Sequence, residues 1–256
     1  ALAFLFASGS VLTSTVPLLR SRRLLMESKL IARPASTASF ASSASAASDD
    51  VEKPRILCLH GKFQSGAIFS NKIAGARRKI AREYELDFVD GPILLPQDEG
   101  ADDDENLAPR AWWNRSDEGK HTLVREAFDY VIERAERERY DAIIAFSQGG
   151  TLATALVSSG ALPNVRALLT AGAPYVPDAF EIAAELSKDS TINGLDVPKL
   201  HLAGETDSMV PVESTRELCE RGGNGELIVH DQGHLFPTRS ARVKEMLDFL
   251  RTALAE

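Results

Sequence analysis

Ala145-Phe146-Ser147-Gln148-Gly149-Gly150 is the stretch that decides the fold. It follows a short apolar run with the character of a strand and opens a run typical of a helix. A serine flanked by small residues at a strand-to-helix turn is typical of a nucleophile elbow, which exposes the hydroxyl. The usual pattern is G-x-S-x-G, and Ala145 stands where the first glycine is expected. The stretch predicts a nucleophilic Ser147, and the alternative is an ordinary strand end before a glycine-rich helix.

Outward from this turn, segments of strand and helix character alternate from residue 53 onward. Six strands separated by helices predict an α/β domain with a mostly parallel sheet and helices on both faces. The last helix carries its apolar side chains at helical spacing, from Val243 to Leu254. The strands are expected at residues 55–60, 84–89, 141–145, 165–170, 199–203 and 226–230, and the helices at 67–82, 122–137, 148–159, 178–186, after Pro211 and at the end of the domain.

One long segment, Asp90 to Gly119, lacks regular patterning. Segments of this length inside a compact domain are usually functional lids or disordered inserts. It contains an acidic run, residues 97–105, whose spacing does not fit a calcium loop, so a solvated loop is expected. The segment also holds Trp112 and Trp113, the only two tryptophans. We expect one to pack on the core and one to line an apolar pocket.

Composition excludes several classes of function. The net charge is −8, and residues 1–48 carry five basic residues and one acidic residue, so the remaining chain is more acidic still. An acidic domain argues against binding the phosphate backbone of nucleic acid. The two cysteines, Cys58 and Cys219, form no disulfide framework or zinc cluster, and the five histidines are scattered singly. No metal and no cofactor are expected.

The first fifty residues differ from the rest of the chain. An apolar, Ser- and Thr-containing stretch is followed by arginines and then by a Ser- and Ala-rich run, a pattern typical of organelle transit peptides. We expect residues 1–50 to be a targeting or disordered segment and residues 51–256 to be the folded α/β-hydrolase domain. About residues 1–48 are expected to be removed in a plastid or mitochondrion. The alternative is a plain extension on a cytoplasmic or nuclear protein. Ser, Thr and Pro interrupt the apolar stretch, so no transmembrane span is expected.

A serine nucleophile needs a base, and the base needs an orienting acid. In an open parallel sheet these groups lie at the carboxyl ends of strands. Asp207 follows the strand at 199–203 and His234 follows the strand at 226–230, which gives the chain order Ser, Asp, His of α/β-hydrolases. Glu205 and His230 are rivals. Asp207 lies deeper in its loop and His234 follows a flexible glycine, so Asp207 and His234 are preferred.

An oxyanion hole needs two backbone N–H groups. One is expected from Gln148, the residue after the serine, at the start of a helix. The other is expected from the loop after the first strand, where Gly61 lets the backbone approach the substrate. Lys62 is the first choice and Phe63 the alternative. His60, in the same loop, is expected to be structural rather than catalytic.

Five motifs together resemble the FSH family of serine hydrolases, which includes the ovarian-tumour-associated esterase-like proteins. They are Leu59-His60-Gly61-x-x-Gln64-Ser65-Gly66, Arg110-Ala111-Trp112-Trp113, Phe146-Ser147-Gln148-Gly149-Gly150, Gly204-x-x-Asp207-x-x-Val210-Pro211 and Gly233-His234-x-x-Pro237. The resemblance spans about residues 53–254 and departs from the family at Ala145. It implies a small α/β-hydrolase without a large cap domain that cleaves an ester or thioester through an acyl-enzyme.

The predicted function is a serine carboxylesterase acting on small-molecule esters. A thioesterase or phospholipase would use the same residues, and a hydrolase-fold protein that only binds a ligand is the alternative from another class. We expect Phe63 with Trp112 or Trp113 to form an apolar wall for medium-to-long acyl chains. The acidic run beside the mouth is expected to disfavour anionic substrates.

Overall fold

The computed structural model describes residues 52–97, 104–115, 121–122, 125–187 and 193–255. The predicted boundary at residue 50 and the targeting segment, residues 1–48, lie outside these residues. Most of the acidic run, residues 98–103, also lies outside them.

Six parallel strands form the central sheet, in the order β10-β9-β8-β7-β1-β2. Neighbouring interior strands are almost completely buried, as expected for a parallel sheet covered on both faces. This architecture confirms the predicted α/β fold with about six strands. The strands are β1 (Arg55–Leu59), β2 (Glu85–Val89), β7 (Ala142–Phe146), β8 (Ala167–Ala171), β9 (Lys199–Gly204) and β10 (Gly225–His230).

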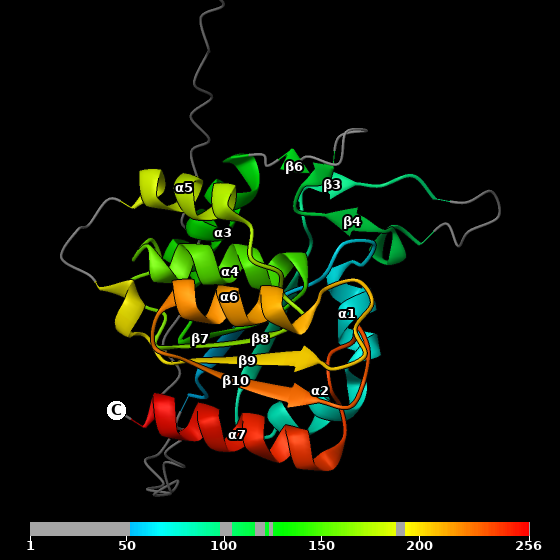
Figure 1. Cartoon of the computed structure of the whole chain (residues 1–256), viewed down its shortest axis with the longest axis vertical. Helices are drawn as coiled ribbons and strands as arrows, with labels where there is room; N and C mark the ends of the chain where they lie inside the picture. Colours follow the sequence, from blue (N-terminus) through cyan, green and yellow to red (C-terminus); the bar gives the residue numbers. More distant parts are fainter. Residues whose placement is uncertain (1–51, 98–103, 116–120, 123–124, 188–192, 256) are drawn as a thin grey trace, which may run out of the picture. The chain divides into compact units, whose positions relative to one another are not determined.

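Helices cover both faces of the sheet, and each face has its own hydrophobic cluster. Figure 1 shows α3 to α6 on one side of the strands and α7 on the other. The residues that pack with α7 also come from α1 and α2. The helices are α1 (Gly66–Lys72), α2 (Ala74–Ile80), α3 (Arg125–Glu138), α4 (Gln148–Ser158), α5 (Pro177–Leu186), α6 (Val212–Gly222) and α7 (Ser240–Leu254).

The single helix predicted over residues 67–82 is wrong, because the chain forms two helices there. Ile73 separates α1 from α2 with φ −98° and ψ 18°, outside the helical range. Its side chain is buried with Phe69 on the α7 face of the sheet. The change of direction brings α2 against α7, where the Lys79 ammonium donates to the Ser240 hydroxyl at 2.9 Å.

The long segment after β2 is more regular than its sequence predicts. Two antiparallel pairs of two-residue strands form there, together with a 3-10 turn at Glu105–Leu107. One pair, β3 (Ile93–Leu94) with β4 (Arg110–Ala111), leads into the two tryptophans. The other pair joins β5 (Asn114–Arg115) and β6 (His121–Thr122). Strands this short carry no periodic signal, so the sequence pattern does not reveal them.

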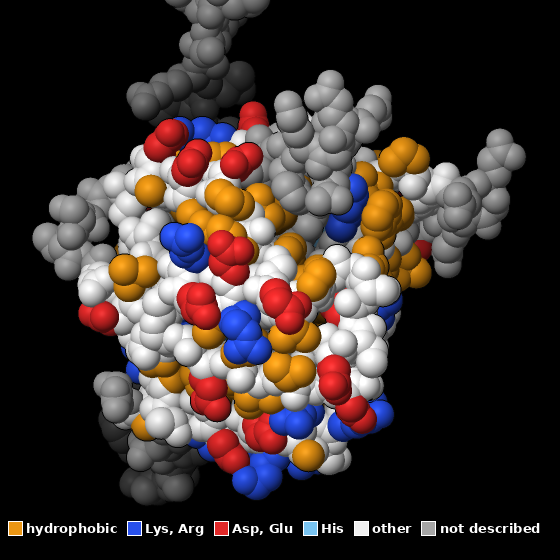
Figure 2. Space-filling view, viewed as in Figure 1, with side chains coloured by type: hydrophobic (Ala, Val, Ile, Leu, Met, Phe, Trp, Pro, Cys, Tyr) orange, Lys and Arg blue, Asp and Glu red, His pale blue; other side chains and the backbone are white. Residues whose placement is uncertain are grey.

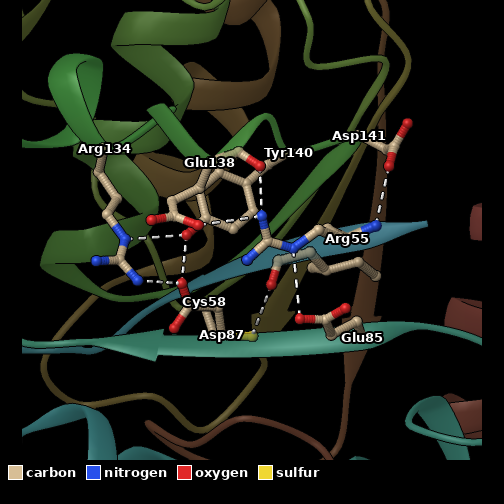
Figure 3. Close-up of polar contacts among 9 residues, drawn as sticks. Arg55, Cys58, Glu85, Asp87, Arg134, Glu138, Tyr140 and Asp141 are labelled. Atoms are coloured by element: carbon tan, nitrogen blue, oxygen red, sulfur yellow. Dashed lines mark hydrogen bonds and ion pairs between the residues drawn. The ribbon is translucent and has the colours of Figure 1, made fainter. Parts of the chain in front are cut away.

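A charged cluster closes the amino-terminal edge of the sheet around Arg55 at the start of β1 (Figure 3). Its guanidinium lies 3.3 Å from Glu138 Oε2 and 3.4 Å from Glu85 Oε1. The Arg55 backbone N–H donates to Asp141 Oδ2 at 2.9 Å. These contacts tie β1 to β2, to α3 and to the entry of β7.

Asp87, Arg134 and Tyr140 extend this cluster into the space between β2 and α3 (Figure 3). The Arg134 guanidinium contacts Asp87 Oδ2 at 2.7 Å, and the Tyr140 hydroxyl donates to the same oxygen. Burial alone would raise the pKa of Asp87, but these donors hold it below its usual value. Burial and the neighbouring carboxylate raise the pKa of Tyr140 to about 12.

No helix within the described ranges is long and apolar enough to cross a membrane. Both cysteines are free and buried, and Cys58 lies in the core between the sheet and α7. Burial raises the pKa of the Cys58 thiol well above its usual value, so this thiol stays protonated at neutral pH.

Candidate active site

Ser147 occupies a sharp turn between β7 and α4. Its backbone has φ 51° and ψ −119°, a conformation that non-glycine residues rarely adopt. The turn needs Gly149, because a Cβ there would lie 2.7 Å from the carbonyl oxygens of Leu59 and His60. Ala145 is fully buried in β7, so the extra methyl group at this position is accommodated inside the core. The strand-to-helix turn therefore has the geometry predicted for a nucleophile elbow.

His234 and Asp207 approach this serine from the loops that follow β10 and β9. His234 Nε2 lies 3.1 Å from Ser147 Oγ, and His234 Nδ1 lies 2.7 Å from Asp207 Oδ2. The side chain of Asp207 is 1 % exposed and that of His234 is 15 % exposed. The other carboxylate oxygen, Asp207 Oδ1, accepts the backbone N–H groups of Met209 and Val210, each at 2.8 Å. The side chains form one continuous chain of hydrogen bonds.

The rival residues lie outside this chain. Glu205 is exposed, and its backbone N–H donates to the His230 carbonyl at 2.7 Å. His230 is the last residue of β10 and is buried, with its Nδ1 accepting the Gln232 backbone N–H. Burial lowers the pKa of His230 below its usual value. Of the two acids and two histidines considered from the sequence, the structure brings Asp207 and His234 to the serine.

Gly172, directly after β8, is a contributor that the sequence reasoning missed. Its φ is +56°, and a Cβ at this position would lie 3.1 Å from the imidazole ring of His234. The His234 ring also packs against Phe146 with 4.9 Å between ring centroids. The available sequence signal was a glycine directly after a buried strand, at the edge of the sheet where the other site residues lie. The missing side chain of Gly172 leaves the space that the His234 imidazole fills.

The loop after β1 lies against the elbow, and its two candidate donors, the N–H groups of Lys62 and Phe63, differ in their hydrogen bonding. A Cβ on Gly61 would lie 3.1 Å from Ser147 Cβ, so the two backbones are in close approach. The Phe63 N–H donates to the Arg110 carbonyl at 2.9 Å and is thus already used. Neither Lys62 N–H nor Gln148 N–H has a hydrogen-bond partner within the part of the chain that the structure describes.

His60 holds this loop in place, which fits its predicted structural role. Its Nδ1–H donates to the Gly61 carbonyl at 2.7 Å, and its Nε2 accepts the Gly91 N–H at 2.8 Å. This pattern defines one tautomer of a neutral ring. Burial lowers the pKa of His60 to about 4, so the ring stays uncharged at neutral pH.

Trp112 and Trp113 do not form a wall of a substrate pocket. Their exposed fractions are 0 % and 1 %, and both belong to the core cluster on the α3 side of the sheet. The Trp112 indole N–H donates to the His60 carbonyl at 2.8 Å. The prediction that a tryptophan forms an apolar wall is therefore wrong, because both rings are enclosed by core packing, and Trp112 supports the loop after β1.

The side chain of Gln148 adds a second support that the sequence reasoning missed. Its Oε1 accepts the Trp112 backbone N–H at 3.2 Å, and its Nε2 donates to the Trp113 carbonyl at 2.9 Å. Gln148 is therefore clamped to the backbone beyond β4. A side chain able both to donate and to accept, next to the nucleophile, was the only sequence signal for this role.

A cavity of about 280 Å³ opens beside His234 on the face of the sheet covered by α1, α2 and α7. It lies between α1 and the loop that carries the histidine. Neither tryptophan lines it, and Phe63, which is 61 % exposed, lies outside it. Its lining residues are Gln64, Phe69, Lys72, Ile73, Phe146, Gln232, His234, Leu235, Phe236 and Thr238.

The described residues contain no group of three or more His, Cys, Asp or Glu side chains placed to hold a metal ion. The arrangement around Ser147 can perform nucleophilic chemistry with protein groups alone. A hydroxyl is hydrogen-bonded to an imidazole, and the imidazole is oriented by a carboxylate.

This sheet order and this elbow define an α/β-hydrolase. Among solved structures, maize acyl-protein thioesterase 2 superposes with a TM-score of 0.57 at 15 % identity, covering 80 % of this chain and 96 % of that chain. Sequence comparison then narrows the class, because the model of the family described as Serine hydrolase (FSH1) matches residues 48–246. The chain belongs to this serine hydrolase family, and the resemblance deduced from the motifs is confirmed.

Several curated relatives carry esterase names. Esterase CG5412 of Drosophila melanogaster is 28 % identical over 221 residues, which is 80 % of this chain and 76 % of that protein. Esterase OVCA2 of Bos taurus is 27 % identical over 215 residues, which is 77 % of this chain and 95 % of that protein. The protein is thus a serine hydrolase with esterase-named homologues.

Proposed function

We propose that this protein hydrolyses carboxylic esters through a covalent acyl-enzyme on Ser147. His234 Nε2 accepts the hydroxyl proton as Ser147 Oγ attacks the carbonyl carbon. The negative charge that develops on the carbonyl oxygen is stabilised by the N–H groups of Lys62 and Gln148. Asp207 keeps the imidazole in the required tautomer. The hydrogen bond of 3.1 Å between His234 Nε2 and Ser147 Oγ is the observation that carries this proposal.

Acylation is completed when the leaving group departs. His234 donates the proton to the departing alkoxide as the carbon–oxygen bond of the ester breaks. A water molecule then loses a proton to His234 Nε2 and attacks the acyl-enzyme, and Ser147 Oγ recovers the proton as the carboxylic acid leaves. No oxidant, metal or cofactor is required by this sequence of steps.

The acyl chain is proposed to be of medium to long length and to run over the exposed ring of Phe63. This ring lies next to the Lys62 N–H donor, and the Lys62 ammonium is 5.0 Å from its centroid. Each methylene group that leaves water would contribute up to about 0.8 kcal/mol. A series of neutral esters with acyl chains from C2 to C12 tests this on wild type and on Phe63→Ala. The wild type should prefer the longer chains, and Phe63→Ala should lose that preference.

Labelling with a fluorophosphonate probe tests the central proposal. The wild-type protein should label at Ser147 and turn over esters, whereas Ser147→Ala should do neither beyond the residual rate left by binding and the oxyanion site. Retention of more than a tenth of the wild-type kcat by a folded Ser147→Ala would refute the assignment. A wild-type protein that neither labels nor turns over esters would instead support the hydrolase-fold binding protein.

A thioesterase activity is a second candidate, because the same three side chains would serve a thioester. The maize structural neighbour is named an acyl-protein thioesterase, which raises this candidate by analogy of fold only. Oxygen esters and thioesters that carry the same acyl group, compared by kcat/KM, separate the two activities. A phospholipase would be revealed by the same comparison with a phospholipid.

We also propose that residues 1–48 direct the protein to a plastid or mitochondrion and are then removed. The basic, Ser- and Ala-rich composition of this segment supports the proposal. Sequencing of the native protein should find a new amino terminus between about residues 45 and 52. The proposal would be contradicted if the native protein still carried residues 1–40. It would also be contradicted if a reporter fused to residues 1–50 stayed in the cytosol.

A further inference from the structure

Large apolar side chains are exposed at the edge of the sheet that carries Ser147. The described part of the chain exposes five such side chains, and three of them follow the carboxyl ends of strands, as Ser147 does. Phe63 follows β1, Leu94 follows β2 and Met209 follows β9, and they are 61 %, 60 % and 70 % exposed. The carboxyl ends of parallel strands meet at one edge, where ligands of open α/β sheets bind. Single exposed apolar residues are ordinary, but a group of them beside one site marks an interaction surface.

Phe63 and Leu94 are neighbours on this edge, because both pair with Arg110 of β4. The Phe63 N–H donates to the Arg110 carbonyl at 2.9 Å, and Leu94 is the register partner of Arg110. Two strand spacings, about 10 Å, therefore separate their backbones. The Arg110 guanidinium between them lies 3.2 Å from Asp90 Oδ2, so its charge is paired. The two apolar side chains thus belong to one surface.

The segment around β3 extends this apolar surface. Leu95 is buried, whereas Leu94 is exposed, and so are Pro92 and Pro96, two positions before and after it. Alternate residues of an extended chain share a face. Figure 2 shows apolar side chains gathered over β3 and β4, on the side of the molecule towards which β9 and β10 point in Figure 1.

Met209 brings a further apolar side chain to this edge, from the loop of the proposed catalytic acid. Its backbone N–H donates to Asp207 Oδ1 at 2.8 Å, and its side chain is the most exposed of the three. Phe63, in turn, is next to the Lys62 N–H, the proposed oxyanion donor. Exposed apolar side chains therefore stand on two of the loops that serve the proposed reaction.

The position of these side chains favours a lipid surface as the partner. A second protein, such as another copy of this chain, would cover Ser147 together with the apolar side chains. The surface of a lipid aggregate differs, because it contains the ester that the serine attacks. Esters with the medium-to-long acyl chains proposed above gather into such aggregates, since each methylene group favours leaving water.

The charge of the protein favours a neutral lipid surface over an anionic one. The net charge is −8, and the acidic run at residues 97–105 contributes to it, so an anionic surface repels the protein as a whole. Charges of both signs border the apolar side chains. The Lys62 ammonium lies 5.0 Å from the centroid of the Phe63 ring, and Glu205, in the loop of Met209, is exposed.

We infer that the catalytic edge docks on the surface of neutral or zwitterionic lipid aggregates and takes its ester substrate from that surface. Phe63, Leu94 and Met209 enter the boundary between head groups and acyl chains, where apolar side chains are removed from water. This inference rests on the proposed function and names the physical form of its substrate. It gives a reason for large apolar side chains to stay exposed at this edge.

Flotation with vesicles of ether-linked phosphatidylcholine tests the docking apart from hydrolysis, because an esterase does not cleave the ether bond. The wild-type protein should float with these vesicles in a density gradient. It should bind no more tightly to vesicles that also contain an equimolar amount of ether-linked phosphatidylglycerol, which is anionic. Leu94→Ser and Met209→Ser should each weaken the affinity for phosphatidylcholine roughly five- to ten-fold, the effect of burying part of one large apolar side chain.

Leu195→Ser is the matched control. Leu195 is 45 % exposed and lies in the 3-10 turn Gly194–Asp196 before β9, at the opposite edge of the sheet, so its replacement should leave the affinity unchanged. All three variants change exposed side chains and should unfold at the wild-type temperature.

Tributyrin is the second probe, because it forms droplets above its solubility limit. The wild-type rate should rise more than in proportion to concentration once droplets form. Leu94→Ser should lose this rise while it keeps the wild-type rate on water-soluble p-nitrophenyl acetate.

Each result decides the question. A wild-type protein that labels with a fluorophosphonate but does not float overturns the inference and leaves the proposed function standing. Equal losses of affinity in Leu94→Ser and Leu195→Ser also overturn it, as does tighter binding to anionic vesicles that salt abolishes. A dimer that Leu94→Ser dissociates would show that a second copy covers this edge, and would overturn it too. A protein that floats but neither labels nor cleaves esters supports the docking and refutes the proposed function.

Discussion

The two oxygens of Asp207 have separate tasks. Oδ2 binds His234 Nδ1 at 2.7 Å, while Oδ1 accepts two backbone N–H groups of its own loop. The backbone contacts fix the carboxylate, so that its free oxygen always meets the same ring nitrogen. The position of this buried acid therefore depends on loop backbone as much as on the histidine.

Asp207→Asn should lower kcat by about 10³- to 10⁴-fold with little loss of stability. The amide can still accept the two N–H groups, but it presents a donor to His234 Nδ1 and so favours the tautomer that cannot accept the serine proton. Steady-state kinetics and urea unfolding measure the two effects. Glu205→Gln, in the same loop and exposed, is the matched control and should keep wild-type kcat. Equal losses in both variants would contradict the assignment.

Sequence reasoning at this scale identified the three side chains that the structure brings together, because chain order and strand ends constrain them. It preferred Lys62 over Phe63 as the oxyanion donor but left both open, since the choice depends on which of the two N–H groups already donates to the Arg110 carbonyl. It expected one of the two tryptophans in the core but not both. An indole next to a predicted site can face either the core or the solvent, and only the tertiary contact with the His60 carbonyl settles the direction.

At the scale of elements, Gln148 links the start of α4 to the segment that follows β4. Gln148→Leu keeps the side-chain volume but removes the hydrogen bonds of Gln148 to the Trp112 N–H and to the Trp113 carbonyl. Loss of these two buried hydrogen bonds should cost about 2–4 kcal/mol in the free energy of unfolding. Urea unfolding measures this, and kcat should fall as well, because the oxyanion loop rests on Trp112. A free energy of unfolding within 0.5 kcal/mol of wild type, about the effect of an ordinary surface substitution, would contradict the clamp.

The packing of α4 on β1 depends on a glycine. Gly149→Ala should destabilise the protein by at least about 2 kcal/mol, because the new methyl group meets the carbonyl oxygens of Leu59 and His60, which cannot move aside. Ala145→Gly, on the other side of the serine, restores the usual elbow glycine and should cost no more than about 1 kcal/mol. Thermal unfolding of the two variants compares them directly, and a smaller loss in Gly149→Ala than in Ala145→Gly would show that the turn is not so tight.

The main strands and helices were predictable because their apolar runs are continuous or periodic. The break between α1 and α2 was not, since no Pro interrupts residues 67–82 and Gly75, the weakest helix former there, lies inside α2 and not at the break. The two-residue strands β3 and β4 were not predictable either. They pair with each other, and the carbonyl and N–H groups of Arg110 also pair with the loop after β1, which is a contact between distant parts of the chain.

At the scale of the whole molecule, buried neutral histidines make the fold sensitive to acid. Burial lowers the pKa of His60 to about 4 and that of His201 to about 3, against about 6.5 in the unfolded chain. Below pH 6.5 the unfolded chain takes up protons that the folded chain refuses. The stabilisation is therefore complete above pH 6.5 and is lost as the pH falls towards the folded values.

The free energy of unfolding should thus fall between pH 6 and 4, and each histidine should contribute about 1.4 kcal/mol per pH unit. His201→Gln removes one of these contributions, so its curve against pH should be shallower by that amount. Urea unfolding at a series of pH values measures the slopes, with pH 8 as the reference at which neither histidine titrates. Parallel curves for the two proteins would contradict the prediction.

Asp141, just before β7, has a consequence for joining this domain to other chains. The start of β1 and the end of α7 meet beside it, since it accepts the Arg55 N–H and pairs with Arg166, whose guanidinium also donates to the Leu254 carbonyl. Ser147 lies at the far end of the same strand, about 20 Å away. A second domain fused near residue 255 is therefore attached at the end of the sheet opposite Ser147. A short linker from residue 255 back to residue 53 would allow a circular permutant in which the edge of the sheet that carries Ser147 stays uncovered.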